Sequence, residues 1–362
     1  MVPVKHKRKD LMGLDVRLDG RCRETISAIR SMDSVLEGFI LTFSDYADLV
    51  GKAHATNVHW STRIEGNRMS LAQVVESSRM ITDSRTIVKA EDPGDRQEAL
   101  NHLYSYFMKD LLKLPWTLNT VSEIHTALMD GTGGDCIPGG IRDTEEVHVS
   151  AGGQEVFIGC PAVHVADELG ALLEWIESSP YDPVVTAIVF FHEFESIRPF
   201  VEGNGRTGRS MFHILMQELG LRNFNLCRVE DKLLNDGDVY YGLLRYTDKT
   251  GDYTPLTRFF IDCIRAAYEE AVEEFGNRDV LKDMDPNSRA LAVQARRTGD
   301  WFTLKDAAGW IRGLGEQSIR SRLNGLTDTG VLERSGRTRA TAYRFKDPFR
   351  SVKEAVAGQR PE

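Results

Sequence analysis

The sequence of 362 residues lacks several features that would set it apart from ordinary globular proteins. Its five cysteines have no C-x-x-C spacing, so we expect neither a disulfide framework nor a cysteine-based zinc site. Its most apolar stretch, residues 184–191, is far shorter than the roughly 20 residues of a membrane helix. The basic N-terminus has no apolar run behind it and does not read as a secretion signal. We therefore expect a protein of the reducing cytoplasm, built of two or three globular units and without a membrane segment.

An excess of positive charge is also missing, since 45 Lys and Arg stand against 54 Asp and Glu, a net charge of −9. On average this argues against a chain-wide nucleic-acid coat. The charge is uneven, however. Residues 312–346 contain eight basic and three acidic side chains, a net charge of +5, which leaves −14 for the rest. Any nucleic-acid contact is therefore expected in this C-terminal segment.

The residue patterns divide the chain into helical and β-rich segments. Residues 22–107 have helical patterns with polar breaks, whereas residues 137–162 contain two short β-rich runs around Gly152-Gly153, the pattern of a hairpin. Residues 182–197 predict a buried helix that Pro199 ends. A glycine-rich loop and a second helix follow, so the predicted order is helix, glycine-rich loop, helix.

This loop carries the densest chemistry, and it reads Arg198-Pro-Phe-Val-Glu-Gly-Asn-Gly-Arg-Thr-Gly-Arg209. The amides of residues 203–206 come just before a helix, where unpaired N–H groups and the positive end of the helix dipole favour an anion. Arg206 and Arg209 lie one turn apart and can reach phosphate oxygens. Glu202 is a candidate ligand for magnesium. The loop therefore predicts a phosphate site.

Other interpretations of the loop compete with this one. The letters Gly203-x-Gly205-x-x-Gly208 match a dinucleotide fingerprint, but that motif directly follows a strand, and here polar residues and Pro199 intervene. A Walker-type loop would end in Gly-Lys-Ser/Thr, which is absent. A plain turn between two helices, with arginines that serve only solvation, stays open on the loop alone.

Taken together, these residues resemble the Fic family, whose members transfer AMP from ATP to hydroxyl groups of target proteins. The family motif is His-Pro-Phe-x-x-Gly-Asn-Gly-Arg-x-x-Arg, and the chain matches every fixed position but the first. Residues 61–67 resemble the Ser/Thr-x-x-x-Glu-Gly/Asn inhibitory motif of some members. Residues 138–162 resemble the flap that holds the target chain, and residues 238–260 resemble the adenine-side segment and closing helix. The resemblance covers roughly residues 35–270.

The resemblance implies a mainly α fold, with a Fic-type helical core and a small β-hairpin flap. Together with the C-terminal pattern described below, it divides the chain into an N-terminal helical region with an inhibitory helix (1–115), a Fic core (116–275) and a winged helix-turn-helix domain (285–347).

The resemblance also implies a role for each loop residue. Glu202 would help to hold Mg²⁺, Asn204 with the amides of Gly203 and Gly205 would cradle the α-phosphate of ATP, and Arg206 and Arg209 would bind its β- and γ-phosphates. Tyr240 or Tyr241 would pack on adenine, although either tyrosine could equally belong to the core. ATP and Mg²⁺ are thus the implied cofactors, and a target protein at the 138–162 flap is the implied partner.

Arg198 stands where the family has its catalytic histidine, which takes the proton from the attacking hydroxyl. A guanidinium stays protonated at physiological pH and cannot serve as that base. Arg198 could instead tighten nucleotide binding, stabilise developing charge, or suit an acceptor that is already ionised. His192 lies on another helix face and is expected to be a buried structural histidine, and nothing in the sequence supports a role for His148 or His164.

Glu65 is unusual on local grounds, because a carboxylate in the last turn of a helix faces the negative end of the helix dipole. The helix is expected to stop near Gly66-Asn67, since Ser70-x-x-Gln73 predicts the capping box of the next one. The resemblance supplies the missing cation, Arg209, and implies that Glu65, with Ser61 one turn earlier, diverts that arginine from the γ-phosphate. A solvated surface glutamate is the alternative.

The C-terminal segment, residues 289–345, resembles a winged helix-turn-helix. Thr303 can cap a first helix, residues 317–326 predict a second, and a basic hairpin bends near residues 335–336. The second helix would lie in the DNA major groove. The candidate DNA contacts are Gln317, Ser318, Arg320 and Ser321 on that helix, and Arg334, Arg337 and Arg339 in the wing. Such domains also serve in dimerisation or protein docking, so a homodimer stays open.

Three functions therefore compete. The first is a protein adenylyltransferase, self-inhibited through Glu65 and impaired by Arg198. The second is a catalytically silent nucleotide-binding protein that regulates through DNA. The third is a hydrolase that removes AMP from modified proteins.

Overall fold

The structure, a computed structural model, describes residues 3–14, 16–84, 86–91, 94–133, 136–143, 146–151, 154–311, 313–336 and 341–358. It is mainly helical, as the sequence predicts. The helices of the first 280 residues are α1 (Gly20–Gly38), α2 (Phe43–Arg63), α3 (Leu71–Asp83), α4 (Asp95–Ser105), α5 (Leu118–Met129), α6 (Val165–Ser178), α7 (Pro183–Ile197), α8 (Asn204–Glu218), α9 (Val229–Leu234), α10 (Gly237–Thr250) and α11 (Thr254–Asn277). Short 3-10 turns cover Leu11–Gly13, Lys109–Leu111, Ala162–His164 and Phe224–Leu226.

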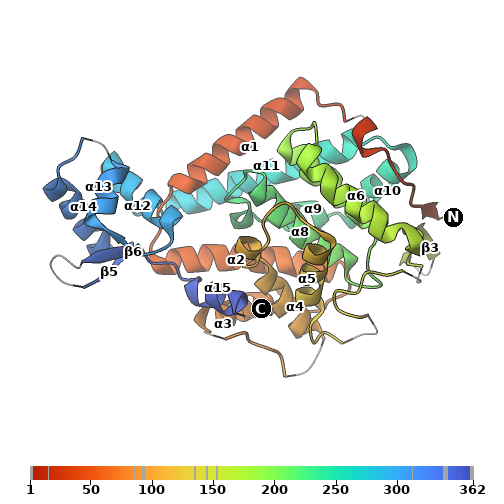
Figure 1. Ribbon diagram of the computed structural model, residues 1–362, viewed down its shortest axis with the longest axis horizontal. Helices are drawn as coiled ribbons and strands as arrows, with labels where there is room; N and C mark the ends of the chain where they lie inside the picture. The colour runs from red at the N-terminus through yellow and green to blue at the C-terminus, as the bar shows by residue number, and fades with distance from the viewer. Residues whose placement is uncertain are drawn as a thin grey trace.

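The long helices α1 and α11 lie side by side and run across most of the molecule (Figure 1). Helix α7 packs against α6, α8 and α11, and thirteen of its fifteen residues are buried. Its apolar sequence explains this, because a helix that is hydrophobic on all sides is stable only inside a core. The glycine-rich loop is therefore attached to the most deeply buried helix of the fold.

The expected boundary at residue 115 does not separate two hydrophobic cores. One continuous cluster includes Ile29 of α1, Val58 of α2, Leu103 of α4 and Phe190 of α7. Helices α2 and α4 both contact α8, so the N-terminal helices complete the core around the loop. Local patterns cannot show this, because they record the apolar face of a helix but not what covers it.

A small sheet lies at one end of the molecule, next to the N-terminus (Figure 1). Strands β2 (His148–Ala151) and β3 (Gln154–Ile158) form the predicted antiparallel hairpin, while the Gly152-Gly153 turn lies outside the described residues. Strand β1 (Val4–Lys5), which the sequence does not predict, pairs in parallel with β3, so the strand order is β1-β3-β2.

The C-terminal unit has its own hydrophobic cluster, at the other end of the molecule (Figure 1). Its elements follow in the order α12 (Pro286–Thr298), β4 (Phe302–Thr303), α13 (Leu304–Trp310), α14 (Glu316–Asp328), β5 (Leu332–Ser335) and β6 (Ala342–Phe345), with strand order β4-β6-β5. Thr303 and Asp306 form a capping box at the start of α13, which confirms the predicted cap.

The chain does not end with this unit. Helix α15 (Arg350–Ala357) returns to the first core, where it contacts α3. Phe349 packs on the rings of Tyr46, His54 and Phe107, and Val352 is buried in the same cluster. This helix is not predicted from the sequence of residues 348–358. Within the described part of the chain, no helix combines the length and apolar character that crossing a membrane requires.

Candidate functional site

Arg198 has an unusual backbone conformation. Helix α7 ends at Ile197, and Arg198 follows with φ 52° and ψ 70°, the left-handed region that non-glycine residues rarely adopt. Within the described residues it is the one non-glycine residue with positive φ. Pro199 disfavours a continued helix, and the Arg198 amide still donates to Phe194 O at 3.0 Å. The chain therefore turns sharply at the position where the family has its histidine.

The loop itself is held by reciprocal hydrogen bonds. The Phe200 amide donates to Asn204 Oδ1 at 2.9 Å, and Asn204 Nδ2 donates back to Phe200 O at 2.7 Å. Gly203 has φ 72°, and a Cβ there would lie 2.7 Å from Met129 Sδ, so no other residue fits without strain. Helix α8 starts at Asn204 with no side-chain cap at Gly203. Its first amides are thus available to an anion.

His125 of α5 fixes the loop from behind. Its ring stacks on Phe200 with centroids 3.6 Å apart. The Gly139 amide donates to Nδ1 at 2.8 Å, so the ring proton is on Nε2, which lies 3.1 Å from Glu202 O and donates to it. Burial lowers the pKa of His125 to about 4. A neutral histidine thereby joins the loop to residues 138–142. The sequence does not predict this role of His125, because nothing in the local pattern of α5 marks the residue.

Arg142 ties the hairpin segment to the end of α7. Its Nε donates to Arg198 O at 2.7 Å, and its Nη2 donates to Cys160 O at 2.6 Å and to Ile197 O at 3.0 Å. The Arg142 amide donates to Pro199 O at 2.9 Å. The side chain is buried, so these carbonyls help to solvate its charge. Arg142 is a positioning residue for the loop.

Glu65 lies between the two loop arginines. It follows α2 in a turn, and one carboxylate oxygen pairs with Arg209 Nη2 while Oε2 lies 3.2 Å from Arg206 Nε. Arg209 also donates from Nε to Ser61 Oγ at 2.6 Å and from Nη2 to Ser61 O at 2.8 Å. The family resemblance implies Arg209 as the partner, and Arg206 is a second partner that it does not imply.

The same carboxylate covers the start of α8. A Cβ built on Gly205 would collide with Glu65 Oε1 and with the Arg209 guanidinium, so the carboxylate lies against the backbone of the first helical turn. Burial raises the pKa of Glu65, the charges of Arg209 and Arg206 lower it, and the net shift is downward. Glu65 is therefore ionised at neutral pH, and its negative charge lies beside the start of α8.

Arg206 has a second carboxylate partner. Its Nη1 lies 3.0 Å from Glu98 Oε1, and Glu98 Oε2 accepts from Asn67 Nδ2 at 2.7 Å. Burial is the largest influence on Glu98 and raises its pKa. Both loop arginines are thus held by groups from α2, α4 and the turn after α2, and none of these groups belongs to the loop.

Around Arg198, by contrast, polar atoms are left without partners. Arg198 Nη1 lies 3.8 Å from Glu195 Oε2, and the buried atoms Arg198 Nε and Glu195 Oε1 have no hydrogen-bond partner among the described residues. Burial raises the pKa of Glu195. Unpaired buried polar atoms are costly, and their presence here is typical of a site that a ligand completes.

The remaining predicted residues of the nucleotide site differ in exposure. Tyr240 is buried beside Phe191, whereas the Tyr241 side chain is 49% exposed. Glu202 is exposed, so its carboxylate can reach a bound cation. His192 is buried, and its ring lies within hydrogen-bond distance of Leu244 O and Glu193, in a place expected of a structural histidine.

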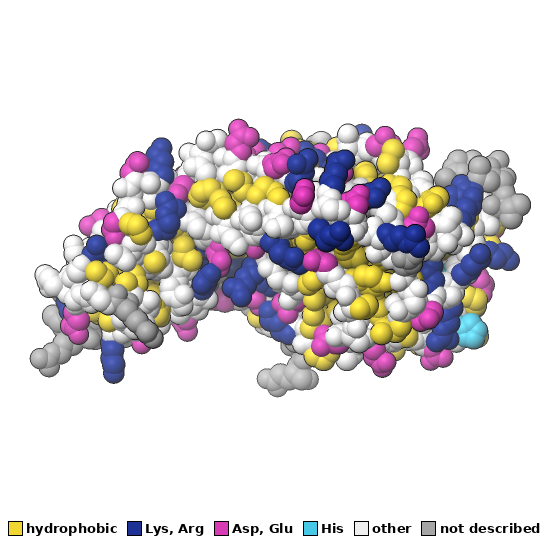
Figure 2. Space-filling view, turned by 90° about the horizontal axis from the view of Figure 1, so that it is seen from above, with side chains coloured by type: hydrophobic (Ala, Val, Ile, Leu, Met, Phe, Trp, Pro, Cys, Tyr) yellow, Lys and Arg dark blue, Asp and Glu magenta, His cyan; other side chains and the backbone are white. Residues whose placement is uncertain are grey.

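On the C-terminal unit, the predicted contacts on α14 face outward. Gln317, Arg320 and Ser321 are exposed and Ser318 is half-buried, whereas Ile319 and Leu323 of the same helix are buried. Arg334 on β5 is exposed, and Arg337 and Arg339 lie outside the described residues. The face of the molecule in Figure 2 shows Lys and Arg side chains interspersed with acidic and apolar ones.

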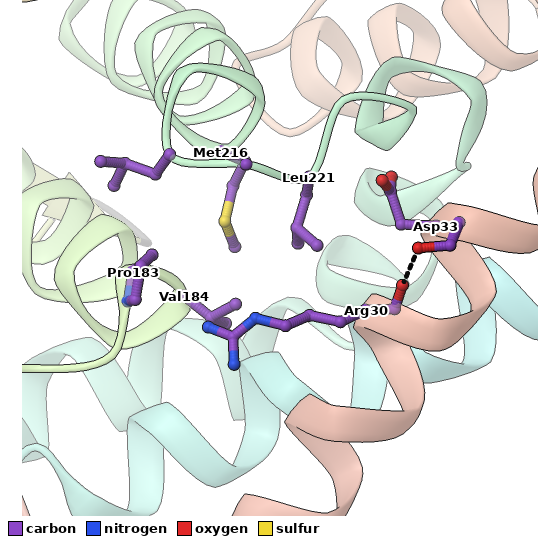
Figure 3. A pocket seen from close by; sticks show the side chains of 9 residues that line it. Arg30, Asp33, Pro183, Val184, Met216 and Leu221 are labelled. Atoms are coloured by element: carbon purple, nitrogen blue, oxygen red, sulfur yellow. Dashed lines mark hydrogen bonds between the residues drawn. The ribbon is translucent and has the colours of Figure 1, made fainter. Parts of the chain in front are cut away.

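A separate cavity lies at the other end of the α7–α8 pair, and it is not connected with the loop. Its volume is about 220 Å³, and its lining includes Arg30, Val184, Met216 and Leu221. Figure 3 shows Met216 and Leu221 facing Val184 and Arg30 across it. Because α7 has 15 residues, its two ends are on the order of 20 Å apart.

Comparison with known proteins supports the likeness to the Fic family. The protein adenylyltransferase Fic of Drosophila grimshawi is 26% identical over 222 residues, which are 59% of this chain and 41% of the relative. That of Drosophila virilis is 27% identical over 250 residues, 67% of this chain and 45% of the relative. The chain thus spans less than half the length of these curated relatives.

Solved structures share the fold. A Fic family protein from Desulfovibrio desulfuricans G20 superposes with a TM-score of 0.60 at 23% identity, covering 91% of this chain and 97% of that one. A fragment of Fic-1 from C. elegans superposes with a TM-score of 0.53 at 18% identity, covering 70% of this chain and 74% of that one. Residues 115–216, which include the hairpin, α7, the loop and most of α8, match the Fic/DOC family. The similarity to the Fic/DOC family is therefore found in the part of the chain that carries the loop.

Proposed function

We propose that the protein binds ATP at the start of α8 and transfers AMP to a protein side chain, and that Glu65 holds it in an inhibited state. The observation that carries this proposal is the position of the Glu65 carboxylate, against Gly205 and between Arg206 and Arg209. A phosphate has the same sign of charge as this carboxylate and also offers acceptor oxygens, so it would bind the same guanidinium groups and the free amides beside them.

In the active state, Glu65 leaves and ATP takes its place. The amides of Gly203 and Gly205 with Asn204 would surround the α-phosphate, and Arg206 and Arg209 would bind the outer phosphates. Glu202 supplies an exposed carboxylate oxygen, the kind of ligand that Mg²⁺ prefers, and that ion would neutralise phosphate charge. Tyr241 is the more accessible of the two candidate adenine contacts.

In the reaction, a hydroxyl oxygen of the target would attack the α-phosphorus, pyrophosphate would leave, and the hydroxyl proton would pass to solvent. Residues 138–162 would hold the target chain. Arg198 cannot take the hydroxyl proton, and loss of general-base help costs roughly 100- to 10,000-fold in rate. Arg198 would instead stabilise charge on the phosphate in the transition state. We therefore expect slow transfer by the natural chain, even after Glu65 is removed.

Arg198 itself favours a second candidate, a catalytically silent nucleotide sensor that acts through DNA. In this view residues 285–347 form a winged helix-turn-helix, an assignment supported by the element order and by the exposed Gln317, Arg320 and Ser321 of α14. Fluorescence polarisation with duplex DNA at two salt concentrations tests it. Absence of salt-sensitive binding at low ionic strength would rule out this role.

One experiment separates the candidates. The natural chain, Glu65→Gly, Arg198→His and the double variant are incubated with ATP, Mg²⁺ and candidate targets, and AMP adducts are measured by mass spectrometry. Adducts with Glu65→Gly support the adenylyltransferase. Adducts only after Arg198→His support the silent sensor, and loss of preformed adducts with the natural chain supports the hydrolase.

The control is Glu98→Gln, which removes a carboxylate from Arg206 but leaves the Glu65–Arg209 pair in place. It should not activate transfer. Calorimetry with ATP accompanies each variant, and failure of both Glu65→Gly and the double variant to bind ATP would overturn the proposed nucleotide site.

A further inference from the structure

The N-terminal arm, residues 4–9, is bound to the hairpin and then buried. Val4 and Lys5 pair with Phe157 and Ile158 of β3, and the His6 amide donates to Ile158 O at 2.8 Å. The His6 side chain then turns into the protein, where it is 9% exposed. Burying a histidine costs free energy unless both ring nitrogens find partners.

At this position, three side chains with different kinds of ligand atom lie close together. His6 Nε2 lies 2.8 Å from Glu168 Oε2, and Cys160 Sγ completes a group whose ligand atoms are all within 4.8 Å of one another. Glu168 comes from α6, and Cys160 follows β3. All three residues are buried. Nitrogen, thiol sulfur and carboxylate oxygen thus lie close together, His6 from the N-terminal arm and the other two from a stretch of the chain far from it in sequence.

The orientation of the imidazole is fixed from its other side. His6 Nδ1 lies 2.8 Å from Ser196 Oγ, and the Ser196 hydroxyl donates to Asp248 Oδ1 at 2.9 Å. Since the hydroxyl proton is given to Asp248, Ser196 Oγ accepts the proton of Nδ1. Nε2 is then the nitrogen directed at Glu168 and Cys160. Metal-ligating histidines are oriented in this way, by a hydrogen bond from the second ring nitrogen.

We propose that His6 Nε2, Cys160 Sγ and Glu168 form a binding site for a zinc ion. In the absence of metal, the hydrogen bond between His6 Nε2 and Glu168 Oε2 occupies this position, and zinc would replace it. Binding would also release the thiol proton of Cys160, because thiolate is the ligand form. Tetrahedral zinc with ligands at about 2.0–2.3 Å places them about 3.3–3.8 Å apart, so small side-chain shifts suffice. One coordination position would remain for water.

The chemistry of the donor set selects the ion. A thiolate excludes Mg²⁺ and Ca²⁺, which prefer oxygen ligands, and a mixed nitrogen, sulfur and oxygen set suits Zn²⁺. The absence of C-x-x-C spacing does not bear on this site, because only one of its three ligands is a cysteine.

The ion would join four segments at the base of the loop. The Cys160 amide lies 3.3 Å from Ile197 O and donates to it, and Cys160 O accepts from Arg142. Ser196, which orients His6, precedes Arg198 by two residues. Zinc would therefore hold the arm, the end of the hairpin, α6 and the end of α7 in one arrangement. This inference is independent of the proposed reaction.

The test is metal content. The tag-free full chain is purified without chelator, equilibrated with a small excess of Zn²⁺, passed through a desalting column and measured by plasma mass spectrometry. We expect about one zinc per chain, and at least a tenfold loss of affinity in each of His6→Asn, Cys160→Ser and Glu168→Gln. The matched control is Cys263→Ser, which removes a thiol outside the group and should keep the zinc.

A second test uses cobalt and the natural chain, so its outcome does not depend on how well the ligand variants fold. Co²⁺ added to the metal-free natural chain should produce a thiolate-to-cobalt charge-transfer band in the near ultraviolet, which Cys263→Ser keeps and Zn²⁺ abolishes. Absence of that band in the natural chain, or zinc retained fully by Cys160→Ser, would overturn the proposal and leave a His6–Glu168 ion pair only.

Discussion

Two sets of arginines in this chain are in opposite electrostatic situations. Arg206 and Arg209 at the loop are buried and paired with Glu65 and Glu98. Arg320 and Arg334 of the C-terminal unit are exposed, and the described residues offer them no ion pair within 4.0 Å. Both sets are candidates for binding phosphate, yet only the second is free to do so.

Because one set of arginines is paired and the other is not, the two sets would respond differently to a phosphate ligand. At the loop, phosphate must displace a carboxylate from a partly desolvated site, so binding is coupled to a rearrangement of Glu65. On the C-terminal unit, phosphate displaces only water and counterions, so binding is graded and depends steeply on salt. Phosphate binding to the first set would therefore change the position of Glu65, whereas binding to the second set would change no contact within the protein.

The largest expected effect is a loss of stability when the Glu65–Arg209 ion pair is removed. Arg209→Ala leaves Glu65, which is only 24% exposed, without its main cation. Because Arg206 still pairs with Glu65, we expect the free energy of unfolding to fall by about 3 kcal/mol, the low end for a broken buried pair, measured by urea denaturation. Arg320→Ala, the exposed counterpart, should change it by less than about 0.5 kcal/mol. Adding Glu65→Ala to Arg209→Ala should restore part of the stability. A double variant no more stable than Arg209→Ala would contradict the coupling.

A pH effect is expected from His125, the histidine that packs behind the loop. The pKa of His125 is about 4 in the folded chain and about 6.5 unfolded, so the unfolded chain binds more protons between these values. Stability from this group is complete above pH 6.5 and is lost as the pH falls towards 4, by up to about 3 kcal/mol. In His125→Gln this part of the pH dependence should be missing. Parallel stability curves for the two chains would refute it.

Removal of the Glu65 carboxylate should raise the affinity of the loop for ATP. Glu65→Gly removes the competitor of ATP phosphates, and hydrogen bonds to charged groups contribute about 1.5–3 kcal/mol. We therefore expect ATP affinity to rise by about 10- to 150-fold, measured by calorimetry. Glu65→Gln, which keeps the shape but not the charge, should give a smaller rise. Equal affinity in all three chains would show that Glu65 does not compete with nucleotide.

The parts of this fold that follow from the sequence are those fixed by neighbouring residues. Helix α7 ends at Ile197 because Pro199 excludes its continuation, and α3 begins at a Ser70–Gln73 capping box as the sequence predicts. The Arg209 partner of Glu65 is also as expected, although from the resemblance and not from local rules. Arg206 as a second partner depends on how far α2 and α8 are apart, which no local pattern records.

The parts that do not follow are those made by distant segments. Strand β1 has only two residues, and it exists because β3 offers it an edge. His125 and Arg142 act through main-chain carbonyls of the loop, which are identical for every residue type and so leave no mark in the sequence. The choice between Tyr240 and Tyr241 likewise depends on burial, because adjacent residues of α10 face different surroundings.

The smallest expected effect tests the exposed set. If Arg320 and Arg334 meet DNA phosphates, each Arg→Gln change should lower the slope of log affinity against log salt by about 1 and weaken binding evenly across sequences. Arg322→Gln is the matched control, because Arg322 is already paired with Asp285 at 3.0 Å and should change the slope less. Polarisation titrations at several salt concentrations measure all three. An unchanged slope in Arg320→Gln and Arg334→Gln would show that the exposed arginines do not bind DNA phosphates.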